Sequence, residues 1–164
     1  MARLERHTTP IRVALAYLTL SAGLVAISIL VAPRSFYDDF PTGPGNWVSA
    51  LPPYNEHLIR DFGAASLGLA VVTLLAAVWM ERRLVQAAAI AIFAGTLPHA
   101  IYHSTTTEAL STADNLGTLG ALYLQALLPL AILYLATGSR QQPDAEARPK
   151  PRWRPRAARE TRTD

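Results

Sequence analysis

The chain of 164 residues contains no cysteine and has few charged residues. Without cysteine it cannot form a disulfide, a zinc–thiolate site, a cysteine-ligated iron–sulfur cluster or a cysteine nucleophile. Charged residues make up 16% of the chain, against about 25% in soluble domains, whereas apolar residues make up 51%. The middle of the chain is therefore neither disordered nor an ordinary water-soluble domain, and any chemistry depends on histidines, carboxylates or hydroxyls.

Long apolar segments dominate the chain up to residue 137. A helix needs about 20 apolar residues to cross the hydrocarbon core of a bilayer, because each residue adds about 1.5 Å. Asn55 is well placed to cap the start of one such helix. The apolar segments predict an all-α, integral membrane four-helix bundle, with loops at 33–57 and 104–115. Four segments meet the length requirement: residues 11–32, 58–80, 84–103 and 116–137.

Basic residues gather on one side of the predicted helices. Thirteen of the fifteen Lys and Arg lie in the N-terminal segment, in the turn at 82–83 or in the C-terminal tail, and only Arg34 and Arg60 lie elsewhere. Cytoplasmic segments of membrane proteins are enriched in Lys and Arg. We therefore expect both termini to be cytoplasmic (N-in, C-in), with residues 1–10 as a short cytoplasmic N-terminus.

The C-terminal segment, residues 138–164, is basic and rich in proline, with almost no apolar residues. This composition predicts a disordered cytoplasmic tail, because it cannot bury a core. One interpretation is that the tail only sets the orientation of the helices. The other is that it binds anionic lipids of the inner leaflet, with Trp153 in the interface. No base-reading motif is present, so we expect no binding to nucleic acid.

Small residues recur at a spacing of four in two of the predicted helices. Ala64 and Gly68 form one such ridge, and Gly117 and Ala121 form the other. Ridges of this kind let two helices approach closely in lipid. They predict a close helix contact within the bundle, with a membrane-protein partner or in a homo-oligomer.

Histidines and carboxylates collect at the outer ends of the second and third predicted helices. His57 and Asp61 are four residues apart, as are His99 and His103, so each pair shares one face of its helix. Because the two helices are antiparallel, His57 is expected to be level with His103, and Asp61 with His99. If the two faces meet, four potential ligands converge near the outer surface.

This residue set has the chemistry of a metal site. Imidazoles with one carboxylate are suitable ligands for copper, iron or zinc. Glu56 and Asp114 lie near enough in sequence to orient such ligands by hydrogen bonds. The pattern therefore predicts an outward-facing metal site for redox chemistry or metal handling.

Other interpretations of the same residues stay open. The His/Asp cluster is also typical of a structural or pH-responsive polar network in a non-enzymatic accessory or scaffold protein, or of a small-ligand or haem pocket. A proton-coupled carrier with Asp61 as its titrating group is less favoured, because no charge lies deeper in the membrane. The loop at 33–57 is rich in aromatic residues and is expected to cover the outer mouth of the bundle or to form a docking surface.

Three motifs resemble those of a known group of proteins. These are Ser35-Phe36-Tyr37-Asp38-Asp39-Phe40-Pro41, the stretch from Pro53 to Gly63 that reads PYNEHLIRDFG, and Pro98-His99-x-x-x-His103. They are similar to motifs of uncharacterised small four-helix membrane proteins from high-GC actinobacteria. The resemblance covers residues 11–137 and implies a bacterial plasma-membrane location and an outward-facing polar motif, but no reaction.

Overall fold

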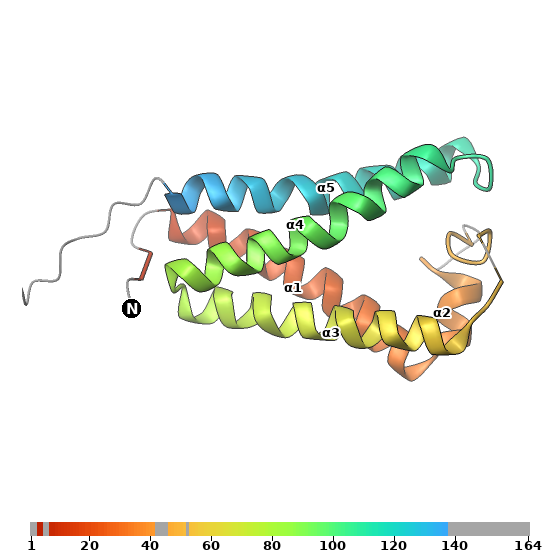
Figure 1. Cartoon of the computed structure of the whole chain (residues 1–164), viewed down its shortest axis with the longest axis horizontal. Coiled ribbons are helices and arrows are strands. Elements are labelled where there is room, and N and C mark those ends of the chain that lie inside the picture. The colour runs from red at the N-terminus through yellow and green to blue at the C-terminus, as the bar shows by residue number, and fades with distance from the viewer. Residues whose placement is uncertain (1–2, 5–6, 42–45, 52, 138–164) are drawn as a thin grey trace, which may run out of the picture.

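The structure, a computed structural model, describes residues 3–4, 7–41, 46–51 and 53–137, and its regular elements are helices (Figure 1). Each of the four long helices is long and apolar enough to cross a membrane. The prediction of an all-α, four-span membrane fold is therefore confirmed. The predicted tail, with Trp153, lies outside the described residues. The long helices are α1 (Thr8–Val31), α3 (Glu56–Trp79), α4 (Arg82–Thr105) and α5 (Thr112–Thr137).

The helices take up parts of the two outer loops that the sequence left irregular. The segment 33–57 contains a short helix, α2 (Pro33–Asp39), which begins with proline, a residue whose fixed φ suits a first turn. The loop predicted at 104–115 is shorter, because α4 continues to Thr105 and α5 begins at Thr112. The predicted cap at Asn55 is confirmed, since its Oδ1 accepts a hydrogen bond from the backbone N–H of Leu58 at 3.1 Å.

All four long helices share a hydrophobic core only at the end where the N-terminus lies (Figure 1). This is the end that the charge distribution predicts to be cytoplasmic. The N-terminal segment closes it, because the backbone N–H of Leu4 donates to the carbonyl of Met80 at 3.0 Å. The core comes from the start of α1, the end of α3, the start of α4 and the end of α5, and includes Ile11, Leu15, Ala76, Val85, Ile92, Ile132 and Ala136.

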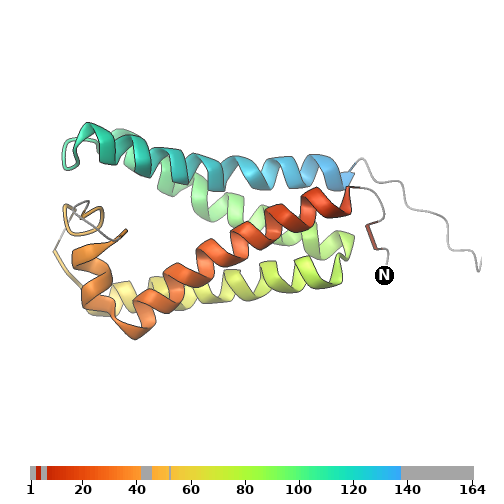
Figure 2. The ribbon, with the colours of Figure 1, turned by 180° about the vertical axis from the view of Figure 1, so that it is seen from behind.

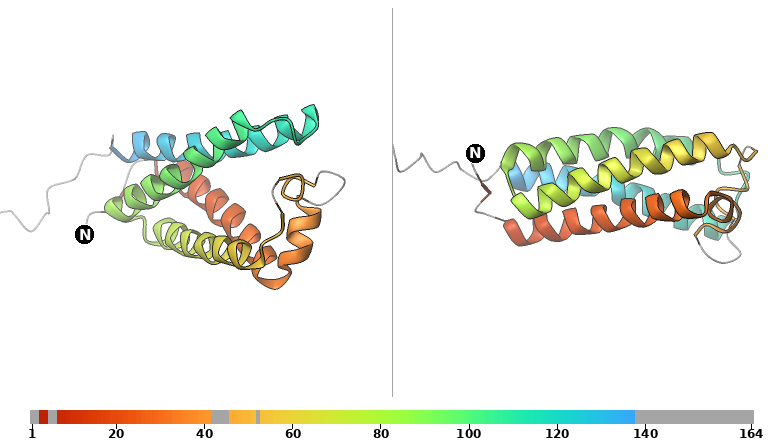
Figure 3. Two further views of the ribbon diagram at one scale, coloured as in Figure 1. Left: turned by 45° about the vertical axis from the view of Figure 1, so that its right-hand side comes forward. Right: turned by 90° about the horizontal axis from the view of Figure 1, so that it is seen from below.

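Towards the other end the bundle divides into two helix pairs. α1 packs along α3 and α4 along α5, whereas α3 contacts α4, and α1 contacts α5, over shorter stretches. The view from behind (Figure 2) and the view turned by 45° (Figure 3, left) show that the two pairs diverge towards the end that carries α2. The molecule is therefore V-shaped, closed at the predicted cytoplasmic end and open at the predicted outer end.

Small residues of α3 make its close contact with α1. The closest approach is at Gly63, where an added Cβ would lie 2.5 Å from Cγ2 of Ile29. Thr73 is on the same seam, and its Oγ1 accepts a hydrogen bond from Oγ1 of Thr19 at 2.9 Å. Small side chains line the buried face of α3 along its length: Gly63, Ser66, Ala70, Thr73, Ala76 and Ala77.

The two predicted small-residue ridges do not form these internal helix contacts. Gly68 has nothing within 4 Å of an added Cβ, and Ala64 is exposed. Gly117 is contacted by the ring of Trp47, whose Cζ2 would lie 2.9 Å from an added Cβ. The residues of these ridges lie on faces that point away from the neighbouring helix, so a contact with a partner or a second copy stays a prediction.

Candidate functional site

Two histidines form a close pair near the outer end of α4. The ring centroids of His99 and His103 are 4.9 Å apart, and the ring planes are inclined by 58°. His103 is buried, with 8% of its surface exposed, whereas His99 is more open. Among the described residues, none is hydrogen-bonded to either imidazole. The pair therefore presents two imidazoles whose nitrogens have no partner in the described part of the chain.

The second predicted pair lies at the start of α3 and is much more open. Nε2 of His57 is 3.4 Å from Oδ2 of Asp61, and the two side chains are 88% and 63% exposed. On the same turns, Glu56 pairs with Arg60 at 2.8 Å. Ion pairs as exposed as these contribute little to stability. The His57–Asp61 pair is therefore available to other partners at low cost.

The structure brings the two pairs to similar depth without joining them. The ring of Phe62 lies edge-on to the ring of His99, with centroids 6.5 Å apart, so the first turns of α3 and the last turns of α4 are level as predicted. Phe62, rather than Asp61, makes this contact. Neighbouring residues on a helix differ in direction by about 100°, so Asp61 is on a different face. No group of three or more His, Asp or Glu residues able to hold an ion occurs among the described residues.

The two carboxylates predicted to support the ligands have other partners. Asp114 accepts hydrogen bonds from Nε1 of Trp47 at 2.9 Å and from Oγ of Ser111 at 2.6 Å. Glu56 accepts from Nε of Arg60 at 2.9 Å. Neither carboxylate is hydrogen-bonded to a histidine in the described residues. The described contacts therefore do not support the prediction that Glu56 and Asp114 orient the histidine ligands.

Comparisons with known proteins do not add to this geometry. Comparisons with protein-family models, curated proteins and solved structures found no match. The resemblance to the small actinobacterial membrane proteins stays a prediction. Any function therefore has to be argued from the contacts of this chain.

The distance between the two α4 rings fits a shared metal ion. A bond of about 2.0 Å from an imidazole nitrogen to a metal places the ion about 3.2 Å from the centre of each ring. Ring centres 4.9 Å apart then subtend an angle of about 100° at the ion, close to the tetrahedral angle. His99 and His103 can therefore bind one ion together if each turns a nitrogen towards it.

An aromatic bridge spans the open end of the V, within the loop that the sequence predicts to cover the mouth, but the contacts that form it were not foreseen. Phe36 of α2 packs against Phe40 with centroids 4.7 Å apart, and Phe40 packs edge-on against Trp47 at 6.2 Å. Trp47 in turn bonds to Asp114 and covers Gly117 on α5. The bridge therefore connects the α1–α3 pair to the α4–α5 pair. One signal in the sequence could have indicated this contact: Trp47, in the loop expected to cover the mouth, has a single N–H donor that needs an acceptor when the ring is partly buried.

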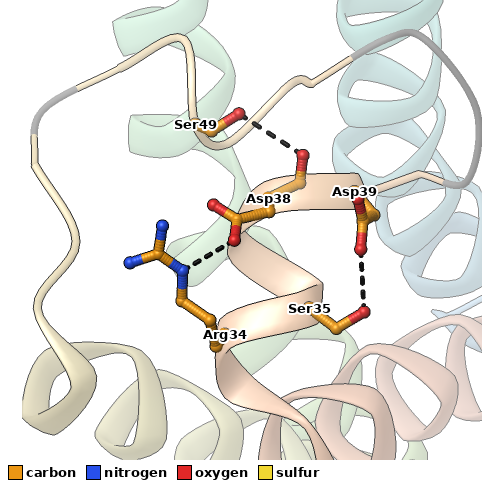
Figure 4. A network of polar contacts seen from close by, with 5 residues as sticks. All are labelled: Arg34, Ser35, Asp38, Asp39 and Ser49. Atoms are coloured by element: carbon orange, nitrogen blue, oxygen red, sulfur yellow. Dashed lines mark hydrogen bonds and ion pairs between the residues drawn. The ribbon is translucent and has the colours of Figure 1, made fainter.

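Polar contacts hold α2 in place beside this bridge (Figure 4). Arg34 pairs with Asp38 at 2.6 Å, and its guanidinium carbon lies 4.9 Å from the centre of the Tyr54 ring. The hydrogen bond to Asp38 raises the pKa of Arg34, so the side chain stays charged. Burial, followed by the nearby Glu56 carboxylate, raises the pKa of Tyr54. Ser35 donates to Asp39 at 2.9 Å, and Ser49 donates to the carbonyl of Asp38 at 3.5 Å.

Proposed function

We propose that this multi-pass membrane protein binds a transition-metal ion through His99 and His103 at the outer end of α4. The observation that carries the proposal is the close imidazole pair, with ring centroids 4.9 Å apart and no hydrogen bond to another described residue. His103 is only 8% exposed, yet neither of its ring nitrogens is among the buried side-chain atoms that lack a partner in the described residues, so both nitrogens remain within reach of a ligand. One metal ion satisfies a nitrogen of each ring at once.

Copper, zinc and iron are the ions whose chemistry suits this pair. Two histidines leave further coordination positions on the ion, which water or an external ligand fills. An ion held at an open end with few protein ligands favours metal handling over a permanently buried cofactor.

The location of the protein is part of the same proposal. With both termini cytoplasmic, the end of the V that carries α2 faces outward, and the histidine pair lies near the outer surface of a bacterial plasma membrane. The basic residues at the closed end support this orientation, because cytoplasmic segments are enriched in them. The protein then meets its ion on the extracytoplasmic side.

Metal content of the purified full-length protein tests the proposal. We expect the wild type, loaded in turn with copper, zinc and iron, to retain about one equivalent of one of them, and His99→Ala and His103→Ala to bind it at least about tenfold more weakly. His7→Ala is the matched control, because His7 precedes α1 at the opposite end of the molecule. His57→Ala shows whether α3 supplies a ligand.

Two results contradict the metal site. One is less than about a tenth of an equivalent of every ion offered to the wild type. The other is wild-type affinity in both α4 variants, with an unchanged helical circular dichroism spectrum.

A non-enzymatic accessory role is the second candidate. It is favoured by the exposed Ala64–Gly68 ridge of α3, where Gly68 has nothing within 4 Å of an added Cβ. Open glycine ridges allow a second helix to approach closely in lipid. In this role the histidines form only a polar network, and the metal assay would find no bound ion.

A further inference from the structure

The described arginines at the two ends of the molecule differ in their partners. At the outer end, Arg34 forms an ion pair with Asp38 at 2.6 Å, and Arg60 forms one with Glu56 at 2.8 Å. Each outer arginine therefore has its charge balanced by a carboxylate on its own helix.

At the closed end, four described arginines lie on the N-terminal segment, on the first part of α1 and at the start of α4, close to the end of α3. Arg3 lies beside Glu81, with which it forms an isolated backbone bridge. Nε of Arg12 donates to the carbonyl of Ala77 at 3.0 Å, which holds this α1 side chain against the end of α3. Arg82 and Arg83 begin α4 directly after the tight turn at residue 80. These four residues, Arg3, Arg12, Arg82 and Arg83, are called the inner arginine cluster below.

The inner arginine cluster lacks carboxylate partners within the described part of the chain. None of its members is within 4.0 Å of a described Asp or Glu oxygen. The ion pairs in the described part of the chain all lie at the outer end. Nε of Arg82 is buried and has no hydrogen-bond partner among the described groups. Glu81 is the one acidic residue described at this end, so the cluster is strongly positive.

The depth of the cluster matches the headgroup region of a membrane. Arg82 and Arg83 immediately follow the apolar span of α3, and Trp79, at the last position of that span, is 51% exposed. Tryptophan is enriched at the membrane–water interface, where its ring sits level with the lipid headgroups. Guanidinium groups at this level meet phosphates, to which they form paired, charge-assisted hydrogen bonds.

We propose that the inner arginine cluster is a binding site for the phosphate of an anionic phospholipid in the cytoplasmic leaflet. Arg12 of α1 is held against the end of α3 by its hydrogen bond to Ala77, and the N-terminal segment with Arg3 is held to the α3–α4 turn by the Leu4–Met80 backbone hydrogen bond. A lipid phosphate bound there supplies the missing anion and joins α1 to the α3–α4 turn. The site lies at the opposite end of the molecule from the histidine pair, so it does not depend on metal binding.

Lipid titration of the full-length protein in neutral detergent tests the site. The probes are phosphatidylglycerol, phosphatidylcholine and inorganic phosphate, with bound lipid counted by native mass spectrometry. The variant is Arg82→Gln/Arg83→Gln, and the matched control is Arg34→Gln/Arg60→Gln, which removes the same charge at the outer end. All proteins keep the same tail, so any binding by the tail is equal among them.

We expect phosphatidylglycerol to bind to the wild type and to the outer control, and phosphatidylcholine not to bind. Each basic residue near the membrane surface contributes about fivefold to the affinity, so the inner double variant should bind about 25-fold more weakly. Arg83→Gln alone keeps the partly buried Arg82 and should bind phosphatidylglycerol about fivefold more weakly than the wild type. This single variant tests the site if the double variant does not fold.

Three results would overturn the proposal. Equal loss in the inner and outer variants shows that only net charge matters. Unchanged affinity in both Arg83→Gln and the double variant shows that the lipid binds elsewhere. Binding of inorganic phosphate as tight as that of phosphatidylglycerol shows a site for the free anion, not for a lipid.

Discussion

A single methyl group added at Gly63 should separate α1 from α3. In Gly63→Ala the new Cβ would lie 2.5 Å from Cγ2 and 3.0 Å from Cβ of Ile29. Ile29 is fully buried, and its β-branched side chain has essentially one favourable χ1 rotamer in a helix. The clash is therefore relieved by moving the helices apart rather than by turning the side chain.

The magnitude follows from comparing glycines that differ only in the space around them. Overpacking a tight contact costs about 1–3 kcal/mol. Replacing glycine by alanine inside a helix gains about 1 kcal/mol of helix propensity, which offsets part of that cost. At Gly68 nothing lies within 4 Å of the added methyl, and at Gly23 the nearest atom is Cβ of Ala70 at 3.8 Å. Gly68→Ala and Gly23→Ala thus carry the propensity gain without the clash.

The difference between Gly63→Ala and Gly68→Ala cancels the propensity term and leaves the overpacking cost of about 1–3 kcal/mol. Reversible unfolding in mixed micelles of increasing SDS content, followed by helical circular dichroism, measures each free energy of unfolding. Ile29→Ala, which removes Cγ2, should cost less stability in the Gly63→Ala background than in the wild type, because it also relieves the clash. If Gly63→Ala unfolds at the same SDS fraction as Gly68→Ala, the close approach of α1 and α3 at this position is refuted.

Two further predictions concern contacts between elements. Thr73→Val keeps the shape of the side chain but removes the hydrogen bond to Thr19, so unfolding should become easier by about 0.6 kcal/mol in the same assay. Thr96→Val, which removes a bond only within α4, should change stability less, and an equal loss would contradict an interhelical role. Trp47→Phe removes the donor to Asp114 and should widen the distance between nitroxide labels on the outer ends of α1 and α5, measured by double electron–electron resonance. An unchanged distance distribution would show that the bridge does not hold the mouth.

The spans were predictable from the sequence because they depend on local composition. An apolar run long enough to cross the membrane forms a helix whatever lies next to it, since backbone groups in lipid must be satisfied within the segment. The cap at Asn55 is equally local, because its side chain bonds to Leu58 three residues on. The depth of His99 opposite the first turns of α3 also follows from span length and direction alone.

The rotation of each helix about its own axis, which decides which residues meet its neighbours, was not predictable in the same way. The spacing of Ala64 and Gly68 is as good a ridge as the seam that α3 uses, yet the close approach occurs one residue earlier, at Gly63. Rotation of α3 by one residue decides whether Asp61 or Phe62 faces His99, and it depends on the packing of the whole α1–α3 seam. A ligand set spread over two helices therefore needs the helix rotations as well as the depths.

The V shape follows from where the side chains that fill the bundle are placed. Large buried residues such as Ile11, Leu15 and Ile132 meet at the closed end, where all four helices contribute to one core. At the open end Gly63 of α3 has no side chain and lies directly against Ile29 of α1, while His103 is buried on α4. Each helix pair is thus packed mainly within itself, and near the open end the described connections between the pairs are the aromatic bridge and the contact of Phe62 with His99. Local opening there costs less than at the core, because fewer apolar contacts are lost. The histidine pair therefore lies at the end of the molecule that opens more easily, and the inner arginine cluster lies at the end where all four long helices share one core.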